Sequence, residues 1–307
     1  MKLSIVATLY QSASYVIEFH QRASAAARQL VGEDYEIVLV NDGSPDNSLA
    51  LAVELTERDP HVVVVDLSRN FGHHKAMMTG LGHSSGERVF LIDSDLEEEP
   101  EWLLSFATQI DLQGSDVIYG VQENRKGGWF ERWSGEWFYS VFQALTGLTL
   151  PVNIVTARLM TRRYVNALLL HREREVLIAG LWLITGFDQR SQVVKKHNTS
   201  HTTYTLRHKM LVLVNAVTSF SNAPLIGIFY IGVLISLLAM VYLIFLIIQW
   251  MFLAKPLSGW TSVMGSIWLI GGMIISFIGV VGIYLAKIFS ETKQRPYTIV
   301  RQVYAKE

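Results

Sequence analysis

Short apolar runs alternate with amphipathic stretches through the first two thirds of the chain. Five runs rich in β-branched residues lie at 3–9, 35–40, 61–67, 88–92 and 116–121. Helical patterns separate most of them, for example at 14–30 and 48–57. Strands that alternate with helices predict an α/β domain with a mostly parallel sheet covered on both faces.

The last third of the chain has a different pattern. Residues 225–253 and 261–286 form two runs without a charged residue. A helix that crosses a bilayer needs about 20 apolar residues, and both runs are longer. Helices of a protein core, the alternative, seldom stay apolar on every face for this length. The pattern therefore predicts two transmembrane helices that form a hairpin, because only the short segment 254–260 separates them.

Positive residues predict how this hairpin is oriented. The connecting segment contains Lys255 alone, whereas several basic residues flank the hairpin, namely Arg207, Lys209, Lys287, Lys293, Arg295, Arg301 and Lys306. Because such residues stay on the cytoplasmic side, both flanks are expected in the cytoplasm. We expect a cytoplasmic catalytic domain at 1–204, an amphipathic juxtamembrane helix at 205–224, two transmembrane helices within 225–289 and a cytoplasmic tail at 290–307.

Aromatic-rich residues 129–149 are expected as a helix that lies in the membrane interface, although a buried core helix is the alternative reading. Composition narrows the function classes further. The chain has 26 Lys and Arg against 27 Asp and Glu, so it lacks the basic excess of nucleic-acid-binding proteins. It has no cysteine, which excludes disulfides, thiolate metal sites and thiol nucleophiles. The short apolar N-terminus lacks a cleavage site and reads as a first strand, not a signal peptide.

Polar residues follow the predicted strands where ligands bind in parallel sheets, at the carboxyl ends. Tyr10 follows the first run, Asp42 the second, and residues 68–75 the third. Asp93, Ser94 and Asp95 follow the fourth. We expect these residues to meet at one edge of the sheet.

The acidic segment, residues 93–98, raises the possibility of a metal site. Asp93 and Asp95, with Glu97 two residues further on, present the oxygen ligands that Mg²⁺ and Mn²⁺ prefer. A solvated acidic loop is the alternative, but the position after an apolar run and on the same edge as Asp42 favours the metal. The remaining acidic residues are expected to be solvated charges near a helix start, namely Glu98, Glu99 and Glu101.

Four features in this order resemble one known family: "VNDGSPDNS", "SRNFGHHKA", "LIDSDLEEEP" and a C-terminal membrane hairpin. The chain resembles the polyprenyl-phosphate glycosyltransferases of glycosyltransferase family 2, which include dolichol-phosphate mannose synthases and bactoprenol glucosyltransferases. The resemblance implies a GT-A fold and a bacterial inner-membrane enzyme. It also implies inverting transfer of a sugar from a nucleotide-diphospho-sugar, with UDP favoured, to undecaprenyl phosphate.

The resemblance also implies roles for individual residues. Asp42 matches the residue that reads the base, and Asp93 and Asp95 match the metal-binding pair. Glu97 stands near the metal where the family usually has Gln. Taken together with their places after the predicted strands, the expected nucleotide-sugar-binding residues are Thr8, Tyr10, Asp42, Asn70, Lys75, Asp93 and Ser94.

Several positions depart from the family pattern. Ser12 replaces an acidic ribose contact, Asn153 and Thr156 occupy acidic positions, Thr203 replaces a lid lysine, and Arg158 is kept. A phosphate acceptor tolerates the missing base, since its second pKa of about 6 leaves it mostly dianionic at neutral pH. Such an acceptor needs cations, and the candidates are Arg125, Arg132, Arg158 and Arg207. The expected catalytic residues are Asp95, Thr156 and Arg158.

Other readings stay open. The chain could extend a glycan already on a lipid, or act as an inactive membrane scaffold. Residues 195–205 could be a lid or an ordinary loop. The spacing of His73, His74 and His83 does not match a zinc site. The sugar is not specified by the sequence, and neither is a homo-oligomeric state.

Overall fold

The computed structural model describes residues 1–122, 140, 143–147, 153–173, 178–196, 214, 217–253 and 259–306. The chain divides into two compact units. The first unit contains Met1–Tyr139, Leu148–Thr205 and Arg295–Glu307, and the second contains Ser140–Gly147 and Leu206–Gln294.

The first unit is built around one mixed sheet. Its described strands follow the order β7-β5-β6-β4-β1-β2-β3-β8. The pairs β1–β2, β1–β4, β2–β3 and β5–β7 are parallel, whereas β6 and β8 pair antiparallel with their neighbours. The strands are β1 (Leu3–Leu9), β2 (Tyr35–Asn41), β3 (Val62–Leu67), β4 (Arg88–Leu91), β5 (Val117–Gln122), β6 (Ile154–Thr161), β7 (Gln189–Val194) and β8 (Val300–Ala305). This architecture confirms the predicted mostly parallel α/β sheet.

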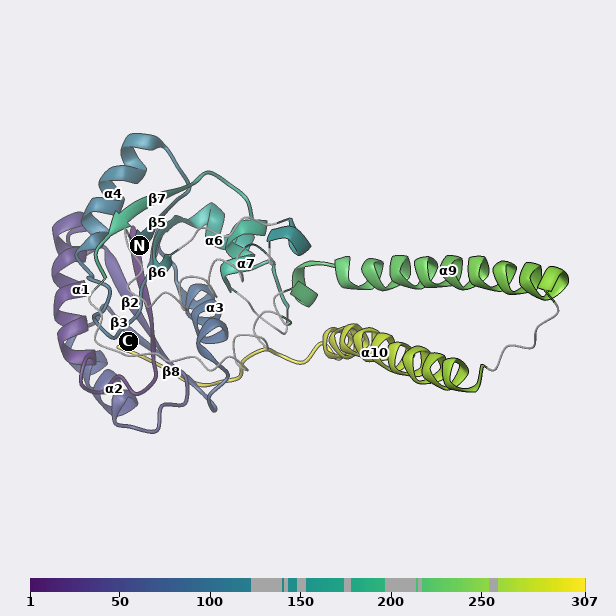
Figure 1. Ribbon diagram of the computed structural model, residues 1–307. Coiled ribbons are helices and arrows are strands. Elements are labelled where there is room, and N and C mark those ends of the chain that lie inside the picture. Colours follow the sequence, from purple (N-terminus) through teal and green to yellow (C-terminus); the bar gives the residue numbers. More distant parts are fainter. Residues whose placement is uncertain are drawn as a thin grey trace. The chain divides into compact units, whose positions relative to one another are not determined.

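Helices cover both faces of this sheet (Figure 1). Its described helices are α1 (Val16–Val31), α2 (Ser48–Arg58), α3 (His73–His83), α4 (Trp102–Gln113), α6 (Arg162–Leu168) and α7 (Ile178–Ile184). Ile5 and Ala7 of β1 share a core with residues of α1, α2 and α4. The intervening Val6 lies against α3, where a Cβ added at Gly80 would come 2.6 Å from Val6 Cγ1. Every residue of β1 and β2 is therefore buried, which explains why these strands read as continuous apolar runs.

Strand β8 was not expected from the sequence, which assigned it to a tail. It pairs antiparallel with β3, and its register places Val64 opposite Tyr304 and Asp66 opposite Gln302. Most β8 side chains are exposed, so the strand lacks the apolar run that revealed β1 to β5. The C-terminal end of the chain is thus an edge strand of the first unit.

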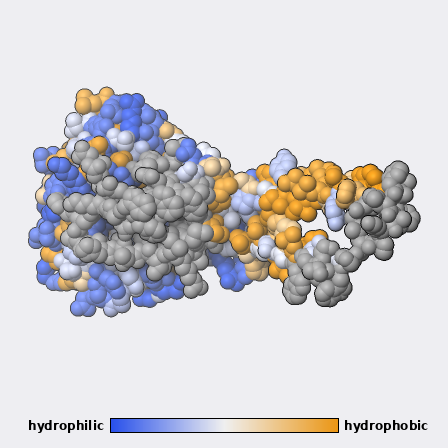
Figure 2. Space-filling view, viewed as in Figure 1, coloured by the Kyte–Doolittle hydropathy of each residue, from blue (hydrophilic) through white to orange (hydrophobic). Residues whose placement is uncertain are grey.

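The second unit contains the predicted hairpin helices, α9 (Ala223–Leu253) and α10 (Trp260–Thr292). Ala223–Tyr242 and Leu269–Thr292 are long and apolar enough to cross a membrane, and neither segment is buried within the protein. Figure 2 shows the apolar surface along both helices. Exposed apolar side chains on helices of this length are typical of contact with lipid.

Polar contacts at one end of α10 join it to the residues that precede α9. Tyr284 Oη donates a hydrogen bond to the carbonyl of Ser221 at 2.7 Å, and Lys287 Nζ donates one to Ser219 Oγ at 2.7 Å. Ser221 Oγ in turn donates to the carbonyl of Leu145. The interfacial helix predicted at 129–149 lies mostly outside the described residues, but its described part belongs to the hairpin unit.

Candidate functional site

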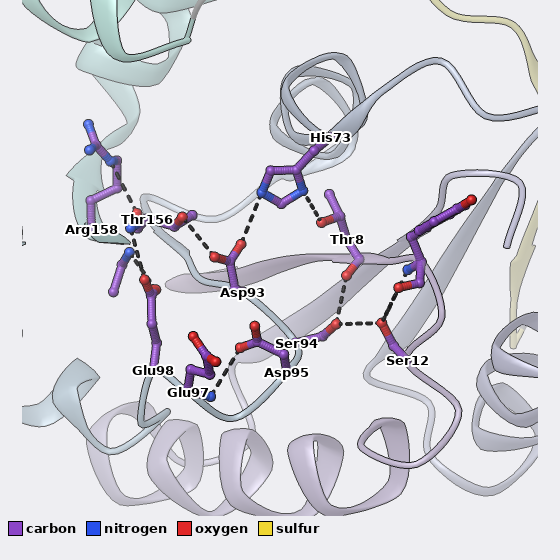
Figure 3. A network of polar contacts seen from close by, with 12 residues as sticks. Thr8, Ser12, His73, Asp93, Ser94, Asp95, Glu97, Glu98, Thr156 and Arg158 are labelled. Carbon is purple, nitrogen blue, oxygen red and sulfur yellow. Dashed lines mark hydrogen bonds and ion pairs between the residues drawn. The ribbon is translucent and has the colours of Figure 1, made fainter. Parts of the chain in front are cut away.

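The site is assembled where β4 and β6 pair side by side. The antiparallel register places Leu91 opposite Arg158, so Asp93 comes beside Thr156 two residues further along. Thr156 Oγ1 donates a hydrogen bond to Asp93 Oδ2 at 2.9 Å. Figure 3 shows the Asp93 carboxylate turned toward Thr156 and His73. His73 and Thr156, which are far apart in the sequence, therefore contact the same Asp93 carboxylate.

His73, the first residue of α3, is the second partner of Asp93. Its Nε2 lies 3.2 Å from Asp93 Oδ1, and its Nδ1 lies 3.0 Å from Thr8 Oγ1. Burial lowers the pKa of His73, but the Asp93 carboxylate outweighs burial and the net pKa is raised. Burial conversely raises the pKa of Asp93, and His73, Thr156 and Lys196 bring it below its usual value. The two side chains thus form an ion pair.

The sequence analysis missed His73 because it tested the histidines only for zinc spacing. A usable signal was present, since His73 directly follows the "RNFG" turn at the expected ligand-binding edge. Position relative to a strand end was therefore more informative than spacing between histidines.

Glu98 was expected to be a solvated charge, and this expectation is wrong. Its side chain is fully buried, and its two carboxylate oxygens accept backbone hydrogen bonds from Thr156 at 3.0 Å and Ala157 at 2.8 Å. Burial and the nearby Asp93 charge raise the pKa of Glu98 to about 8, against the opposing effect of Lys196. Glu98 holds the start of β6 in place beside Asp93.

Lys196 reaches the acidic segment from the residues after β7. Its Nζ lies 3.2 Å from Glu97 Oε2 and 3.7 Å from Glu98 Oε1. Burial lowers the pKa of Lys196, but the carboxylates of Glu98, Asp93 and Glu97 outweigh burial and raise it. The second residue of the polar segment 195–205, which was considered as a lid, is therefore held by the acidic segment.

The three predicted metal ligands are not assembled as a metal site in this structure. Asp93 faces His73 and Thr156, Glu97 pairs with Lys196, and Asp95 Oδ1 accepts the Glu97 backbone N–H at 3.0 Å. Among the described residues, no group of three His, Asp or Glu side chains is placed to hold a metal ion. The donor chemistry suits a hard cation, but the chain's own cations pair with two of the three carboxylates. In the arrangement shown, partners within the chain hold these carboxylates, and the metal site stays a prediction.

Asp42 joins the loops that follow β2 and β3. Its Oδ1 accepts the Phe71 N–H at 2.7 Å and its Oδ2 accepts the Gly72 N–H at 3.0 Å. Burial raises the pKa of Asp42, and these two donors oppose that rise. Gly43 has a positive φ of 59°, and a Cβ there would come 2.4 Å from Asn70 N. The two loops are thus packed backbone against backbone.

The remaining nucleotide-sugar candidates divide into an inner and an outer group. Ser94 is buried, and its Oγ donates to the Thr8 carbonyl at 2.7 Å and lies 3.2 Å from Ser12 Oγ. Thr8 is also buried, so these side chains tie the ends of β1 and β4 together. The outer group is more accessible, with Tyr10 and Asn70 exposed and Lys75 half-buried.

Arg158 is fully buried behind Thr156. Its Cζ lies 2.9 Å from the centroid of the Trp182 ring, and its Nε donates to the Thr156 carbonyl at 3.3 Å. Neither terminal nitrogen has a hydrogen-bond partner in the described part of the chain, and burial lowers the Arg158 pKa to about 9. The other acceptor candidates, Arg125, Arg132 and Arg207, lie outside the described residues.

The mostly parallel sheet with polar residues at its strand ends is an α/β domain of the GT-A type. The sequence model of glycosyl transferase family 2 matches residues 4–169, more than half of the chain, and the chain belongs to this family.

Relatives match the chain over nearly its whole length. A Mycobacterium tuberculosis protein described as putative glycosyltransferases is 50% identical over 100% of this chain and 90% of its own length. The Escherichia coli prophage bactoprenol glucosyl transferase homolog is 28% identical over 99% of each chain. The bactoprenol glucosyl transferase of Shigella phage SfV is 29% identical over 98% of each. The Staphylococcus aureus TarS 1–349 structure in complex with UDP-GlcNAc gives a TM-score of 0.49 at 19% identity, covering 71% of this chain and 66% of that one.

Proposed function

We propose that this protein transfers a sugar from a UDP-sugar to a polyprenyl phosphate, with undecaprenyl phosphate as the acceptor and with inversion at the anomeric carbon. The observation that carries the proposal is the extent of similarity to proteins named bactoprenol glucosyl transferase. The matches cover 98–99% of both chains and therefore include the apolar hairpin as well as the sheet domain. A membrane hairpin suits an enzyme whose acceptor stays in the bilayer.

The nucleotide-sugar would bind at the carboxyl ends of β1, β2 and β3, where ligands bind in sheets of this type. Tyr10 and Asn70 are exposed there, and the Asp42-anchored loops shape the edge. Lys75 and the positive N-terminal end of α3 favour the negatively charged pyrophosphate. Asp42, Asp93, Thr8 and Ser94 hold the surrounding backbone and side chains.

The reaction would need little proton transfer. A polyprenyl phosphate has a second pKa of about 6 and reaches the site mostly as a dianion. One phosphate oxygen would attack the anomeric carbon while the bond from that carbon to the UDP oxygen breaks, and UDP would leave as an anion. Thr156, which donates to Asp93, is therefore not required as a base.

Bringing two anions together requires positive charge and accurate placement. Arg158 lies behind Thr156, and Arg125, Arg132 and Arg207 are the further candidates for the acceptor phosphate. Asp95 is proposed as a catalytic residue because it lies in the acidic segment, two residues after Asp93. No step is assigned to Mg²⁺ or Mn²⁺, because Asp93 and Glu97 face cations of the chain.

The proposed location is the bacterial inner membrane, with the catalytic domain on the cytoplasmic side. Both flanks of the hairpin carry basic residues and the connecting segment carries only Lys255. The product would be a lipid-linked sugar for modification of a cell-envelope glycan. A transferase that extends a lipid-linked glycan, or an inactive scaffold, would share this location.

Incubation of membranes that contain the full-length chain separates these functions. Radiolabelled UDP-sugars are supplied with undecaprenyl phosphate or with a lipid-linked sugar, each with Mn²⁺ or with EDTA. We expect product from undecaprenyl phosphate, and loss of that product by about 100-fold in Asp95→Asn, the size typical of misplaced groups at a reaction site. The control Asp111→Asn removes an exposed carboxylate paired with Arg88 and should keep full activity. Product from the lipid-linked sugar alone would contradict the proposal.

A further inference from the structure

The residues that follow α10 hold the loop after β3 from two directions. The Ile299 carbonyl accepts the Ser68 N–H at 2.9 Å, and an Arg301 terminal nitrogen donates to the Ser68 carbonyl at 2.7 Å. Both backbone hydrogen-bonding groups of Ser68 are therefore bound by the C-terminal segment. Ser68 begins the loop whose Phe71 and Gly72 N–H groups bind Asp42.

Arg301 is also the first residue in a series of polar contacts that connects three loops. Its other terminal nitrogen lies 3.3 Å from Asp66 Oδ2, and Asp66 Oδ1 accepts the Asn41 side-chain amide at 2.8 Å. Asn41 Oδ1 then accepts the Ser44 N–H at 3.2 Å, and Ser44 Oγ accepts the Gln11 N–H at 2.7 Å. These contacts link β8 to the loops after β3, β2 and β1, which carry the nucleotide-sugar candidates.

Asp66 makes this series of polar contacts depend on a positively charged partner. The Asp66 side chain is 1% exposed, so an unpaired negative charge there would be costly. Arg301 is its ion-pair partner among the described residues and extends from a largely solvent-facing strand. A separate contact reinforces the arrangement, since Thr298 Oγ1 lies 2.8 Å from Thr79 Oγ1 on α3, the helix that begins with His73.

We infer that Arg301 is a positioning residue for the nucleotide-sugar site, acting through Ser68 and Asp66 on the loops that would receive the donor. The inference rests on the proposed function, because it identifies those loops as the donor site. Accurately held loops lower the ordering cost of binding, so a change at Arg301 acts on donor affinity more than on the transfer step. Arg301 itself lies on β8 and need not touch the donor.

Kinetics of the full-length chain in nanodiscs test this inference. Arg301→Gln should raise the KM for the UDP-sugar roughly three- to tenfold while kcat stays within about twofold, because it removes contacts of a partly exposed ion pair. Arg301→Lys keeps a positive charge near Asp66 and should recover part of the loss. Lys306→Gln is the matched control, since it removes one charge from the same chain end, where Lys306 Nζ donates to the Glu57 carbonyl at 3.2 Å.

Hydrogen exchange gives a readout that does not require turnover. Amides of residues 68–72 should exchange faster in Arg301→Gln than in the natural chain or in Lys306→Gln, with exchange in α1 and α4 unchanged. Unchanged KM together with unchanged exchange at 68–72 would overturn the inference. Faster exchange throughout the first unit, with a lower melting temperature, would also overturn it by showing general destabilisation.

The two proposals fail in distinguishable ways. A natural chain that turns over no UDP-sugar with any acceptor would reject the proposed function. In that case the local exchange response would still report whether Arg301 holds the loops. Normal turnover with no effect of Arg301→Gln would reject only the positioning role.

Discussion

Each carboxylate in the acidic segment is defined by its partner and not by its membership in an acidic run. Asp93 pairs with His73, Glu97 pairs with Lys196, and Glu98 accepts two backbone N–H groups. These partners come from α3, from the residues after β7 and from β6. Residues that look equivalent in the sequence therefore have different environments, and Glu98 is the clearest case because it is fully buried.

His73 is expected to orient Asp93, which gives a test at this scale. His73→Gln removes the cation beside Asp93 and the fixed contact with Thr8, so the carboxylate loses a fixed orientation. We expect kcat/KM to fall by about 10- to 100-fold, because misplacement of a functional group by about 1 Å costs about 100-fold. His83→Gln is the control, because His83 Nδ1 contacts the Thr79 carbonyl at 2.8 Å, at the other end of α3. Equal activity of the two variants would show that His73 does not position Asp93.

At the scale of elements, the loops after β2 and β3 depend on one close backbone approach. Gly43 combines a positive φ with a position where a side chain has no room, since Asn70 N is 2.4 Å from the ideal Cβ. Gly32 also has a positive φ, of 66°, but no heavy atom lies within 4 Å of its ideal Cβ. A substitution at Gly32 therefore tests backbone strain alone, whereas a substitution at Gly43 tests backbone strain together with a steric contact.

Substitution of these glycines by alanine tests that contact. Gly32→Ala should lose about 1–2 kcal/mol of stability, because a left-handed conformation disfavours a Cβ, and Gly43→Ala should lose more because its Cβ also meets backbone atoms. Only Gly43→Ala should also push the loop 68–72 away from Asp42, and we expect UDP to bind it at least tenfold more weakly. Isothermal titration calorimetry with UDP measures the difference. Equal UDP affinity in the two variants would contradict the packing argument.

Asp59, which directly follows α2, joins α1 to the residue that precedes β3. Its oxygens contact His20 Nε2 of α1 at 2.8 Å and His61 Nδ1, just before β3, at 2.7 Å. Burial raises the pKa of Asp59, but hydrogen bonds from His61 and His20 outweigh burial and lower it. An Asp with a lowered folded pKa stabilises the fold above its unfolded value of about 3.9, and this contribution disappears as the pH falls through the folded pKa.

Asp59→Asn should therefore be less stable than the natural chain by about 1–3 kcal/mol at pH 7. The difference should shrink as the pH falls below about 4, because the natural carboxylate then becomes protonated. Thermal unfolding of both proteins in detergent at a series of pH values measures this stability difference. Asp111→Asn, which breaks an exposed ion pair, should stay within about 0.5 kcal/mol at every pH. If the stability difference between Asp59→Asn and the natural chain does not become smaller in acid, the proposed link between Asp59 ionisation and stability is wrong.

At the scale of the whole molecule, the chain alternates between the two units. The first unit includes Arg295–Glu307, which follows the hairpin, so the sheet domain contains residues from both sides of the apolar helices. If α9 and α10 each cross the bilayer, Leu112 and Lys306 must lie on one side and the segment 254–260 on the other. The absence of natural cysteine makes this arrangement easy to test.

Single cysteines report the topology in intact cells. Ser258→Cys should react with a membrane-impermeant maleimide from outside the cytoplasm. Leu112→Cys, at a position that is 81% exposed, and Lys306→Cys should react only after the membrane is opened. Labelling of all three from one side would show that the hairpin does not span the membrane.

The parts predicted correctly are those that depend on local pattern. The five buried strands β1 to β5 appear as apolar runs because helices cover both faces of the sheet, and α9 and α10 appear as uncharged runs. Strand β6 was missed because the polar Thr156 and Arg158 interrupt its apolar pattern, and β7 and β8 were missed because most of their residues are polar or exposed. Among the residues that lie together at the strand ends, Asp42 and Asp93 were predicted from their places after strands, whereas His73, Glu98 and Lys196 were not; their roles in binding stay predictions.

The sequence by itself determined the alternation of strands and helices, the apolar hairpin and the set of polar residues at the strand ends, because hydrophobic periodicity and chain order are local properties. Only the tertiary structure decided how those polar residues are used. Pairing of β6 with β4, the start of α3 and the return of β8 to β3 bring together residues that are distant in the chain. Burial then requires each charge to find a partner, and that requirement sets Asp93 against His73, Glu97 against Lys196 and Asp66 against Arg301.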